Sequence, residues 1–244
     1  MERTGIVGEY TWQKRISDIF ANNPFFKEKI GNHIVFYHPE STDKDTFFSK
    51  IDTVLYFNTN PACYQTIIQA VRSSKNIFIA FPDKLTHDQL LHLSDLCIEA
   101  NTNMWLSIPN LYHPYIKWIN DNAGKPAYIE TKHILSRPLS TEYLFQVLFQ
   151  ELLFIMSIIG RDAWLLNSGV FSISGKIPDL INVHIEFDNF NSAYIQCGNI
   201  SEVNQHEYCF FVPGKILCVN FPEDKLKILY SKDTIRPENQ INTQ

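Results

Sequence analysis

Several histidines are among the candidates for chemistry in this chain, because a histidine side chain titrates near neutral pH. His133 lies between Lys132 and Arg137 on a segment that we expect to be a strand. Such a group of cationic side chains could hold an anionic ligand, and the alternative is a charged, solvated sheet face. His113 falls where we place a junction between two domains and could contact a ligand there. For His113 the alternative is helix capping or solvent exposure.

The spacing of other candidates argues against metal and nucleophile chemistry. His87 and His92 are five positions apart, so they do not share a helical face, and no carboxylate stands at metal-ligand spacing from them. We expect surface histidines and no metal site. Cys63 follows a turn, but no neighbour in the sequence would activate its thiol. No G-x-S-x-G segment is present, so hydrolase chemistry with a serine nucleophile has no support.

The composition is that of a globular protein that does not bind nucleic acid. Hydrophobic residues make up 45% of the 244 residues, enough to bury a sizeable core. The formal net charge of -5, without a local run of Lys or Arg, argues against a nucleic-acid surface. The five cysteines are odd in number and contain no C-x-x-C pair, so we expect reduced, mostly buried thiols.

The sequence also predicts a cytoplasmic protein without a membrane contact. The N-terminal residues are interrupted by charges and lack the apolar run of a signal peptide. The most apolar segment, residues 143–159, is interrupted by polar side chains and is shorter than the roughly 20 residues of a membrane span. We therefore expect a buried helix there.

The elements that must position the candidate side chains are clearest between residues 51 and 82. An apolar strand at 54–57 is followed by an amphipathic helix at 64–71 and a second strand at 77–79. Two strands joined by one helix are parallel neighbours with a right-handed crossover. Ligands bind beyond the carboxyl ends of such strands, so the turns at 58–61 and 80–82 should face any functional cleft.

The alternation of strands and helices extends over residues 4–108. Thr86 to Gln89 match a capping box at the start of a helix that ends before Asn101. Further strands are expected at residues 4–8, 33–38 and 104–108. This order predicts an α/β, Rossmann-like domain with a parallel sheet over residues 1–110.

Beyond residue 110 the pattern changes. We expect a helix near 112–120, a strand at 127–135 and a long apolar helix near 141–160, followed by alternating strands from Val170 onward. In the cleanest of these strands, at 181–188, apolar residues alternate with polar ones. The pattern predicts an α+β domain with an open antiparallel sheet over residues 111–230 and a disordered tail over residues 231–244.

Several short sequence segments occur in the same order and with the same spacing as in a known protein family. They are residues 51–60, the strand end at Ala80-Phe81-Pro82, the helix that follows Thr86, and Lys125-Pro126 before a strand. Over nearly the whole chain these phrases resemble the Gfo/Idh/MocA family of NAD(P)-dependent oxidoreductases. The resemblance implies a dinucleotide-binding domain and a second domain whose open sheet often mediates oligomerisation.

The glycine-rich turn of that family is replaced. In the family, G-x-G-x-x-G lets the backbone approach the pyrophosphate at a helix N-terminus. Gly8 opens the matching phrase, but the following residues through Gln13 supply none of the remaining glycines. Glu9 would add like charge, and the bulky Tyr10 would obstruct the diphosphate. Glu40 is the candidate for the strand-end carboxylate that holds a ribose hydroxyl.

The catalytic positions implied by the resemblance are also replaced. Phe81 stands at the lysine of the family's E-K-P, and an apolar ring cannot donate a charge-assisted hydrogen bond to a substrate. Gln150 and Leu153 match the histidine and carboxylate of its H-x-x-D, and neither can act as a general base. The ionisable group nearby is Glu151, for which a hydrogen-bonded or partly solvated helix residue is the alternative to a functional one.

These departures together predict a family-type cleft without hydride-transfer chemistry. The residues expected to line it are Gly8, Tyr10, Glu40, Asn58, Asn60 and Ala80. We predict no cofactor, and a binding, scaffolding or regulatory role with a small-molecule ligand or a protein partner. The alternative is an active oxidoreductase that uses NAD or NADP on a small hydroxylated substrate such as a sugar derivative.

The second domain predicts a homodimer. Its expected sheet carries more large aromatic side chains than one covering helix would hide, so we expect part of it to pack against another subunit. The aromatic residues are Phe171, Phe187, Tyr194, Tyr208, Phe210 and Phe211.

Overall fold

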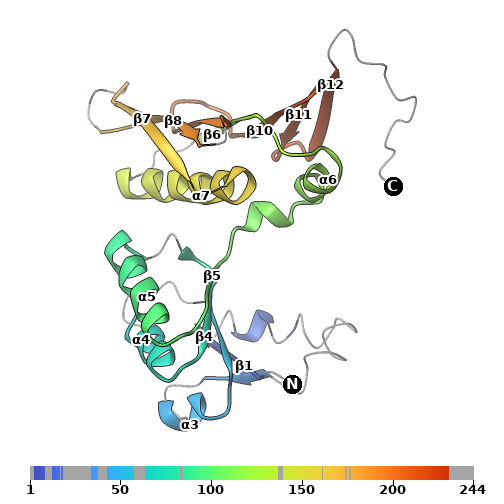
Figure 1. Ribbon diagram of the computed structural model, residues 1–244. Coiled ribbons are helices and arrows are strands. Elements are labelled where there is room, and N and C mark those ends of the chain that lie inside the picture. The colour runs from blue at the N-terminus through green and yellow to red at the C-terminus, as the bar shows by residue number, and fades with distance from the viewer. Residues whose placement is uncertain are drawn as a thin grey trace. The chain divides into compact units, whose positions relative to one another are not determined.

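A computed structural model describes residues 3–8, 13–16, 18, 34–37, 43–57, 64–82, 85–136, 140–160, 162–173, 175, 177–188 and 190–230. The chain divides into two compact units, Met1–Ser107 and Ile108–Gln244, and each unit has its own sheet and hydrophobic core (Figure 1). Several residues of the sequence-based predictions lie outside the described residues: Tyr10, Glu40, Asn58, Asn60, Cys63, Arg137 and the tail 231–244.

The first unit is built on a parallel sheet of five strands, as predicted, in the order β2-β1-β3-β4-β5. The strands are β1 (Thr4–Gly8), β2 (Ile34–Phe36), β3 (Thr53–Phe57), β4 (Asn76–Ile79) and β5 (Met104–Leu106). Because β2 and β3 lie on opposite sides of β1, the strand order reverses at the β1/β3 pair. In open parallel sheets this reversal is where ligands bind, beyond the carboxyl ends of the strands.

The helices of the first unit bury one stripe each in its core. They are α3 (Lys44–Phe48), α4 (Tyr64–Arg72) and α5 (His87–Glu99). Ile67 and Val71 of α4 and Leu93 of α5 are buried together with the apolar strand residues, as their helical spacing predicts. The predicted capping box at the start of α5 is confirmed, because the Thr86 hydroxyl and the Gln89 side chain each accept from the backbone N–H of the other residue.

The second unit contains a sheet of seven strands in the order β12-β11-β10-β6-β9-β8-β7. The strands are β6 (Tyr128–Ile134), β7 (Ala163–Phe171), β8 (Leu180–Phe187), β9 (Ser192–Gly198), β10 (Gln205–Val212), β11 (Lys215–Asn220) and β12 (Lys225–Tyr230). The predicted antiparallel sheet is confirmed, with one parallel pair in it, formed by β6 and β9. The chain leaves β6 through a helix and returns by the β7–β8–β9 meander, and this crossover brings β9 alongside β6 in the same direction. The strand series also begins at Ala163 rather than Val170.

Helices pack on one face of this sheet. A 3₁₀ turn at Pro109–Tyr112 precedes α6 (Pro114–Asn122), and the long helix α7 (Thr141–Ile159) lies across the central strands (Figure 1). By length and composition α7 is apolar enough to cross a membrane. Its Leu144, Phe154 and Ile155 nevertheless pack into the core with β8 and β9, as the buried-helix prediction requires.

The structure places the side chains that two predictions concern. Phe187, Tyr208 and Phe210, three of the aromatic residues named for the homodimer, are buried in the core of the chain itself. Cys209 and Cys218 face each other on β10 and β11 and form a disulfide, so the prediction of reduced thiols is wrong for this pair. Cys97 and Cys197 are free and buried, as predicted.

Candidate functional site

The carboxyl edge of the parallel sheet is uncharged in the described part of the chain. Strands β1, β3 and β5 end at Gly8, Phe57 and Leu106, and β4 is followed by Ala80, Phe81 and Pro82. Ala80 and Pro82 are buried and Phe81 is half-buried. Among the described residues at these strand ends there is no Lys, Arg, His, Asp or Glu. The described residues at these strand ends therefore offer no charged side chain for proton transfer, and Tyr37, which follows β2, is buried in the core.

Gln13 is a buried polar residue at the same edge, in the helical segment after β1. Its Nε2 donates to the carbonyl oxygen of Gly8, at 3.0 Å, and to that of Tyr37, at 2.9 Å. The side chain is 5% exposed, and its Oε1 is buried without a hydrogen-bond partner among the described residues. One amide thus ties together the ends of β1 and β2, at the position where a G-x-G-x-x-G turn would have its third glycine.

Gly8 is required by the packing of the sheet itself. A Cβ atom at this position would lie 3.1 Å from the carbonyl oxygen of Phe57 and 3.2 Å from the Phe57 Cβ atom. These are closer than ordinary van der Waals contacts, and one of the two is to the backbone of the neighbouring strand. The close approach of β1 to β3 is therefore sufficient to explain a glycine here without a bound dinucleotide.

Helix α7 places Gln150 and Leu153 in half-buried positions, and it buries the residue next to Gln150 completely. That residue, Glu151, is 0% exposed, and its carboxylate lies over the central strands of the sheet. An ionised group in such a position is stable only if hydrogen bonds or opposite charges replace its hydration. Glu151 is therefore the residue around which a polar site is organised in the second unit.

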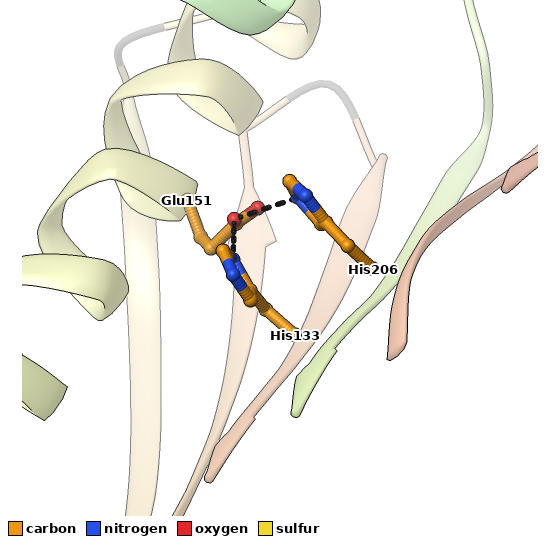
Figure 2. A group of neighbouring side chains, drawn as sticks. All are labelled: His133, Glu151 and His206. Atoms are coloured by element: carbon orange, nitrogen blue, oxygen red, sulfur yellow. Dashed lines mark hydrogen bonds and ion pairs between the residues drawn. The ribbon is translucent and has the colours of Figure 1, made fainter. Parts of the chain in front are cut away.

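Four side chains of β6 and β10 form the floor of this site. The antiparallel register sets His133 opposite His206 and Thr131 opposite Tyr208, and residues two apart on a strand face the same side. The four side chains therefore form two neighbouring cross-strand pairs on the face that α7 covers. Figure 2 shows the Glu151 carboxylate reaching down from α7 to the two imidazole rings.

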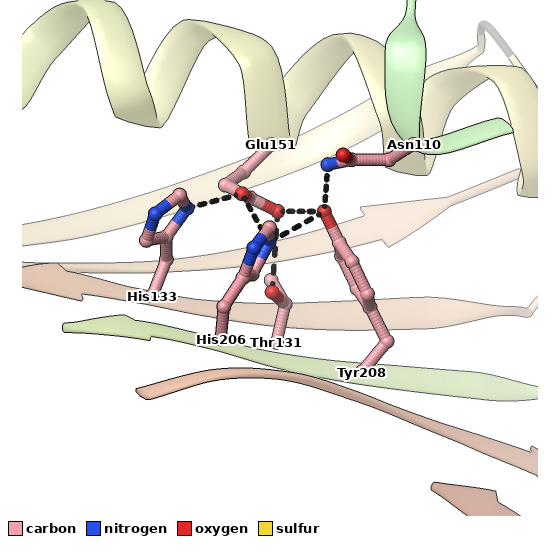
Figure 3. Close-up of polar contacts among 6 residues, drawn as sticks. All are labelled: Asn110, Thr131, His133, Glu151, His206 and Tyr208. Carbon is pink, nitrogen blue, oxygen red and sulfur yellow. Dashed lines mark hydrogen bonds and ion pairs between the residues drawn. The ribbon is translucent and has the colours of Figure 1, made fainter. Parts of the chain in front are cut away.

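Each oxygen of Glu151 accepts two hydrogen bonds or ion-pair contacts (Figure 3). Oε1 lies 2.7 Å from His133 Nδ1 and 3.2 Å from His206 Nε2. Oε2 accepts from the Tyr208 hydroxyl at 2.6 Å and from the Thr131 hydroxyl at 3.2 Å. The Tyr208 hydroxyl in turn accepts from the amide of Asn110 at 2.6 Å. The rings of His133 and His206 stack with their centroids 3.9 Å apart.

The electrostatics of the group follow from burial and from these contacts. Burial alone would raise the pKa of Glu151, but hydrogen bonds from His133 and His206 outweigh it and lower the pKa to about 2. Burial lowers the pKa of His206, and Glu151 only partly opposes this effect. Burial and the charge of Glu151 raise the pKa of the Tyr208 hydroxyl. At neutral pH the site thus contains an ionised Glu151 beside a neutral His206 and a neutral Tyr208.

The two histidines are the accessible part of the group. The side chains of His133 and His206 are 15% and 16% exposed, whereas that of Glu151 is 1% exposed. When His133 donates its Nδ1 proton to an ionised carboxylate, the lone pair of Nε2 stays available. A buried carboxylate that orients a partly exposed imidazole is an arrangement that can accept a proton or ligate a metal ion.

The other histidines singled out in the sequence do not join this group. Lys132 points to the opposite sheet face from His133, because neighbouring strand residues alternate, so the predicted cationic cluster does not form between these two. His113 precedes α6, and its Nε2 lies 3.5 Å from Asp224 Oδ1. His87 is exposed, and His92 Nδ1 lies 2.8 Å from the Tyr64 hydroxyl, so neither belongs to a metal site.

His206 and Tyr208 were not identified as site residues from the sequence. Their i, i+2 spacing, like that of Thr131 and His133, indicates that each pair faces one side of a strand. The missing information was that β6 and β10, about seventy residues apart, are neighbours with a defined register.

A parallel five-stranded sheet followed by a mixed seven-stranded sheet with a long helix on one face is the two-domain fold of Gfo/Idh/MocA-type oxidoreductases. Solved structures of this class are similar to the chain over most of its length. No model of a known protein family matches the sequence, and no curated protein is similar to it in sequence.

Three similar structures illustrate the match. UDP-N-acetylglucosamine 3-dehydrogenase GnnA from Acidithiobacillus ferrooxidans has a TM-score of 0.71 and 14% identity, over 94% of this chain and 80% of that one. Levoglucosan dehydrogenase, in complex with NADH and L-sorbose, has a TM-score of 0.69 and 14% identity, over 96% and 77%. Biliverdin reductase from Synechocystis sp. PCC 6803, with biliverdin and NADP+, has a TM-score of 0.61 and 15% identity, over 93% and 84%. At these identities the similarity concerns the fold.

Proposed function

We propose that this chain has kept an oxidoreductase fold but not hydride-transfer chemistry, and that it acts as a binding, scaffolding or regulatory protein without a nicotinamide cofactor. The resemblance places a catalytic lysine where the chain has Phe81, and a histidine and carboxylate where it has Gln150 and Leu153. The uncharged carboxyl edge of the parallel sheet supports the same conclusion.

Gln13 is the observation that carries the proposal. In a dinucleotide-binding turn the third glycine allows close packing of helix on strand, next to the pyrophosphate. Here a glutamine side chain occupies that position and bonds the carbonyl oxygens of Gly8 and Tyr37. Removing this amide would take one hydrogen bond from each of the two carbonyl oxygens, and an intramolecular hydrogen bond contributes about 0.5–1.5 kcal/mol. The Gln13 side chain therefore connects the ends of β1 and β2 by hydrogen bonds within the protein, with no bound nucleotide involved.

Adding NAD(H) or NADP(H) at millimolar concentration should leave the melting temperature of the protein unchanged. A ligand at 100 times its Kd stabilises the folded state by about 2.7 kcal/mol. For a chain of this size such a gain corresponds to roughly 5–10 °C. The measurement is a thermal-shift titration of the full chain with each nucleotide, followed by the same titration with fluorescence detection.

Levoglucosan dehydrogenase, which has been solved with NADH, is the positive control for the titration. Saturable binding of either nucleotide to this chain with a micromolar Kd would contradict the proposal. In that event the chain would be assigned to the second candidate function, an active NAD(P)-dependent oxidoreductase that acts on a small hydroxylated substrate such as a sugar derivative.

One observation favours that second candidate. The pair of Glu151 and His133 supplies a buried carboxylate and an accessible imidazole, the components of a general base, although at positions other than those implied by the resemblance. Nucleotide binding together with a rate of nucleotide reduction that falls in a His133→Ala variant would establish this function. Binding without reduction would instead indicate a nucleotide sensor.

We also propose that the protein forms a homodimer through the sheet of its second unit. Strand β7 is an edge strand, and its large apolar side chains are exposed on both faces: Trp164 62%, Leu166 56%, Val170 50% and Phe171 48%. An exposed apolar edge strand is a template for pairing with another chain, and a second copy offers the same edge. A cytoplasmic location remains a prediction from the sequence.

Replacing Leu166 with aspartate should convert a dimer into a monomer of 28.4 kDa. A charge in the centre of the edge strand would have to be buried without a partner in the dimer. The molar mass is measured by size-exclusion chromatography with light scattering. Ile98→Asp is the matched control, because Ile98 is 76% exposed on α5 of the other unit and should not affect assembly. A wild-type chain that elutes as a monomer at micromolar concentration would refute the dimer.

A further inference from the structure

We propose that His133, Glu151 and His206 bind one divalent transition-metal ion of the zinc type. This inference goes beyond the proposed function, since it concerns only the second unit and holds whether or not a nucleotide binds to the first. It rests on the ligand set, the distances between ligand atoms, the second layer of hydrogen bonds and the charge of the site.

The ligand set is two imidazole nitrogens and one carboxylate oxygen. Two histidines and a glutamate hold zinc in hydrolytic enzymes, and two histidines with a carboxylate hold non-haem iron. Calcium and magnesium prefer sites made of oxygen ligands alone. Two nitrogens of three ligands therefore select a transition metal, and three protein ligands leave a fourth position for water or a small ligand.

To hold a metal ion, the proposed ligand atoms of His133 and His206 must move slightly away from Glu151. Metal bonds of about 2.0–2.2 Å at tetrahedral angles set neighbouring ligand atoms about 3.3–3.5 Å apart. Glu151 Oε1 now lies 2.7 Å from His133 Nδ1, which would have to give up its proton to bind the ion, and 3.2 Å from His206 Nε2. All three ligand atoms lie within 4.8 Å of one another. Binding thus requires the contact with His133 to open by about 0.6–0.8 Å and the contact with His206 by about 0.1–0.3 Å, and the two imidazole rings now have an interplanar angle of 17°.

A second layer of contacts holds the carboxylate in place. Tyr208 and Thr131 both donate to Oε2, and Asn110 donates to the Tyr208 hydroxyl. Oε1 is thereby kept towards the imidazoles. Because the three ligands come from β6, α7 and β10, each is fixed by a different element of the core. Outer contacts of this kind are what orient ligands in known metal sites.

The charge of the site calls for a cation. Glu151 is a fully buried carboxylate, and no Lys or Arg forms an ion pair with it in the described part of the chain. Its partners are hydroxyl groups and imidazoles, so a divalent ion at Oε1 would be the one full opposite charge at this anion. The imidazoles are the more exposed side of the group, whereas Glu151 is sealed beneath α7.

The test is metal binding to the full, untagged chain after treatment with EDTA and removal of the chelator. Calorimetry with Zn²⁺ should give one ion per chain with a Kd of micromolar or below. Co²⁺ should produce visible absorption bands of a site with nitrogen and oxygen ligands and low coordination number. Mg²⁺ at the same concentration should not bind.

Alanine variants of the two histidines test whether the bound Zn²⁺ is held by these residues. His133→Ala and His206→Ala should each weaken Zn²⁺ binding by about 100-fold, at least the effect of losing a second-layer contact. His184→Ala should leave it unchanged, because His184 is a half-exposed histidine of β8 that lies 4.0 Å from Glu186, outside the group. Circular dichroism checks that each variant is folded, and His133→Gln replaces His133→Ala if the latter is not.

Three outcomes overturn the inference. If the wild-type chain binds no Zn²⁺ at about 100 µM, the group is a polar network of the core and not a metal site. If Zn²⁺ binds but both histidine variants bind it equally well, the ion sits elsewhere. Binding that His184→Ala abolishes would likewise place it on the other sheet face.

Discussion

Glu151→Ala should lower the free energy of unfolding by about 3–5 kcal/mol, through the cavity left in the core and the hydrogen bonds that are lost. The carboxylate accepts from two hydroxyl groups and contacts two imidazoles, and all four donors lie beneath α7 or at its edge. Its removal takes from the buried Tyr208 hydroxyl its carboxylate acceptor and leaves Asn110 and His206 as its partners, and it opens a cavity in the core. The measurement is equilibrium unfolding in urea, followed by circular dichroism, in the presence of EDTA.

Glu142→Ala is the matched control for this measurement. Glu142 lies in the first turn of the same helix and is exposed, so only its interaction with the helix N-terminus is lost, worth about 0.3–1 kcal/mol. If Glu151→Ala does not fold, Glu151→Gln keeps the volume and one acceptor oxygen, and we expect it to be less destabilised than the alanine variant. A loss for Glu151→Ala no greater than that for Glu142→Ala would show that the network contributes nothing to stability.

The fold could be predicted from the sequence because its local signals agree with one another. The apolar strands 54–57 and 77–79, with a helix between them, define a parallel pair, and the structure contains that pair as β3 and β4. The capping box at Thr86 was equally local. The parallel pairing of β6 and β9 was not predictable in this way, because it depends on where the chain returns after a crossover of more than fifty residues.

The candidate site was harder to predict, since it depends on register. Thr131 and His133 face the same side as Tyr208 and His206 only because β6 and β10 pair in this register. A register shift of one residue would place the side chains of one strand on the opposite face of the sheet. The long helix then had to place Glu151, and not the neighbouring Gln150, over the sheet. The sequence did identify Glu151 as the ionisable residue of this segment.

For Gln13 the sequence indicated the position, as a replaced glycine, but not the hydrogen bonds that the side chain forms. The absence of a third glycine indicated only that something was missing from a dinucleotide-binding turn. The structure adds that the replacing side chain bonds two strand ends. Such a contact spans 24 residues and depends on tertiary packing, so no local pattern could indicate it.

Lowering the pH from about 5 to 2 should cost about 3 kcal/mol of stability through Glu151 alone. Its pKa in the folded state is about 2, against an ordinary value of 4.5, and each pKa unit is worth about 1.4 kcal/mol. Because the folded-state pKa is the lower one, the unfolded chain takes up the proton first as the pH falls. The stabilising contribution is therefore complete above the unfolded pKa and is lost towards the folded one.

The contribution of Glu151 can be isolated by comparing the wild type with Glu151→Gln over this pH range, both in EDTA. All other carboxyl groups titrate in both proteins, so their effects cancel in the difference between the two free energies of unfolding. Burial also lowers the pKa of His206, so this residue too lowers the stability of the folded protein as the pH falls. That loss begins once the pH falls below the ordinary histidine pKa, and therefore at a higher pH than the loss through Glu151. The difference between wild type and variant should shrink steadily from pH 5 to pH 2. A difference that stays constant over that range would mean that folding leaves the pKa of Glu151 unchanged, so the network would not stabilise the carboxylate as an anion.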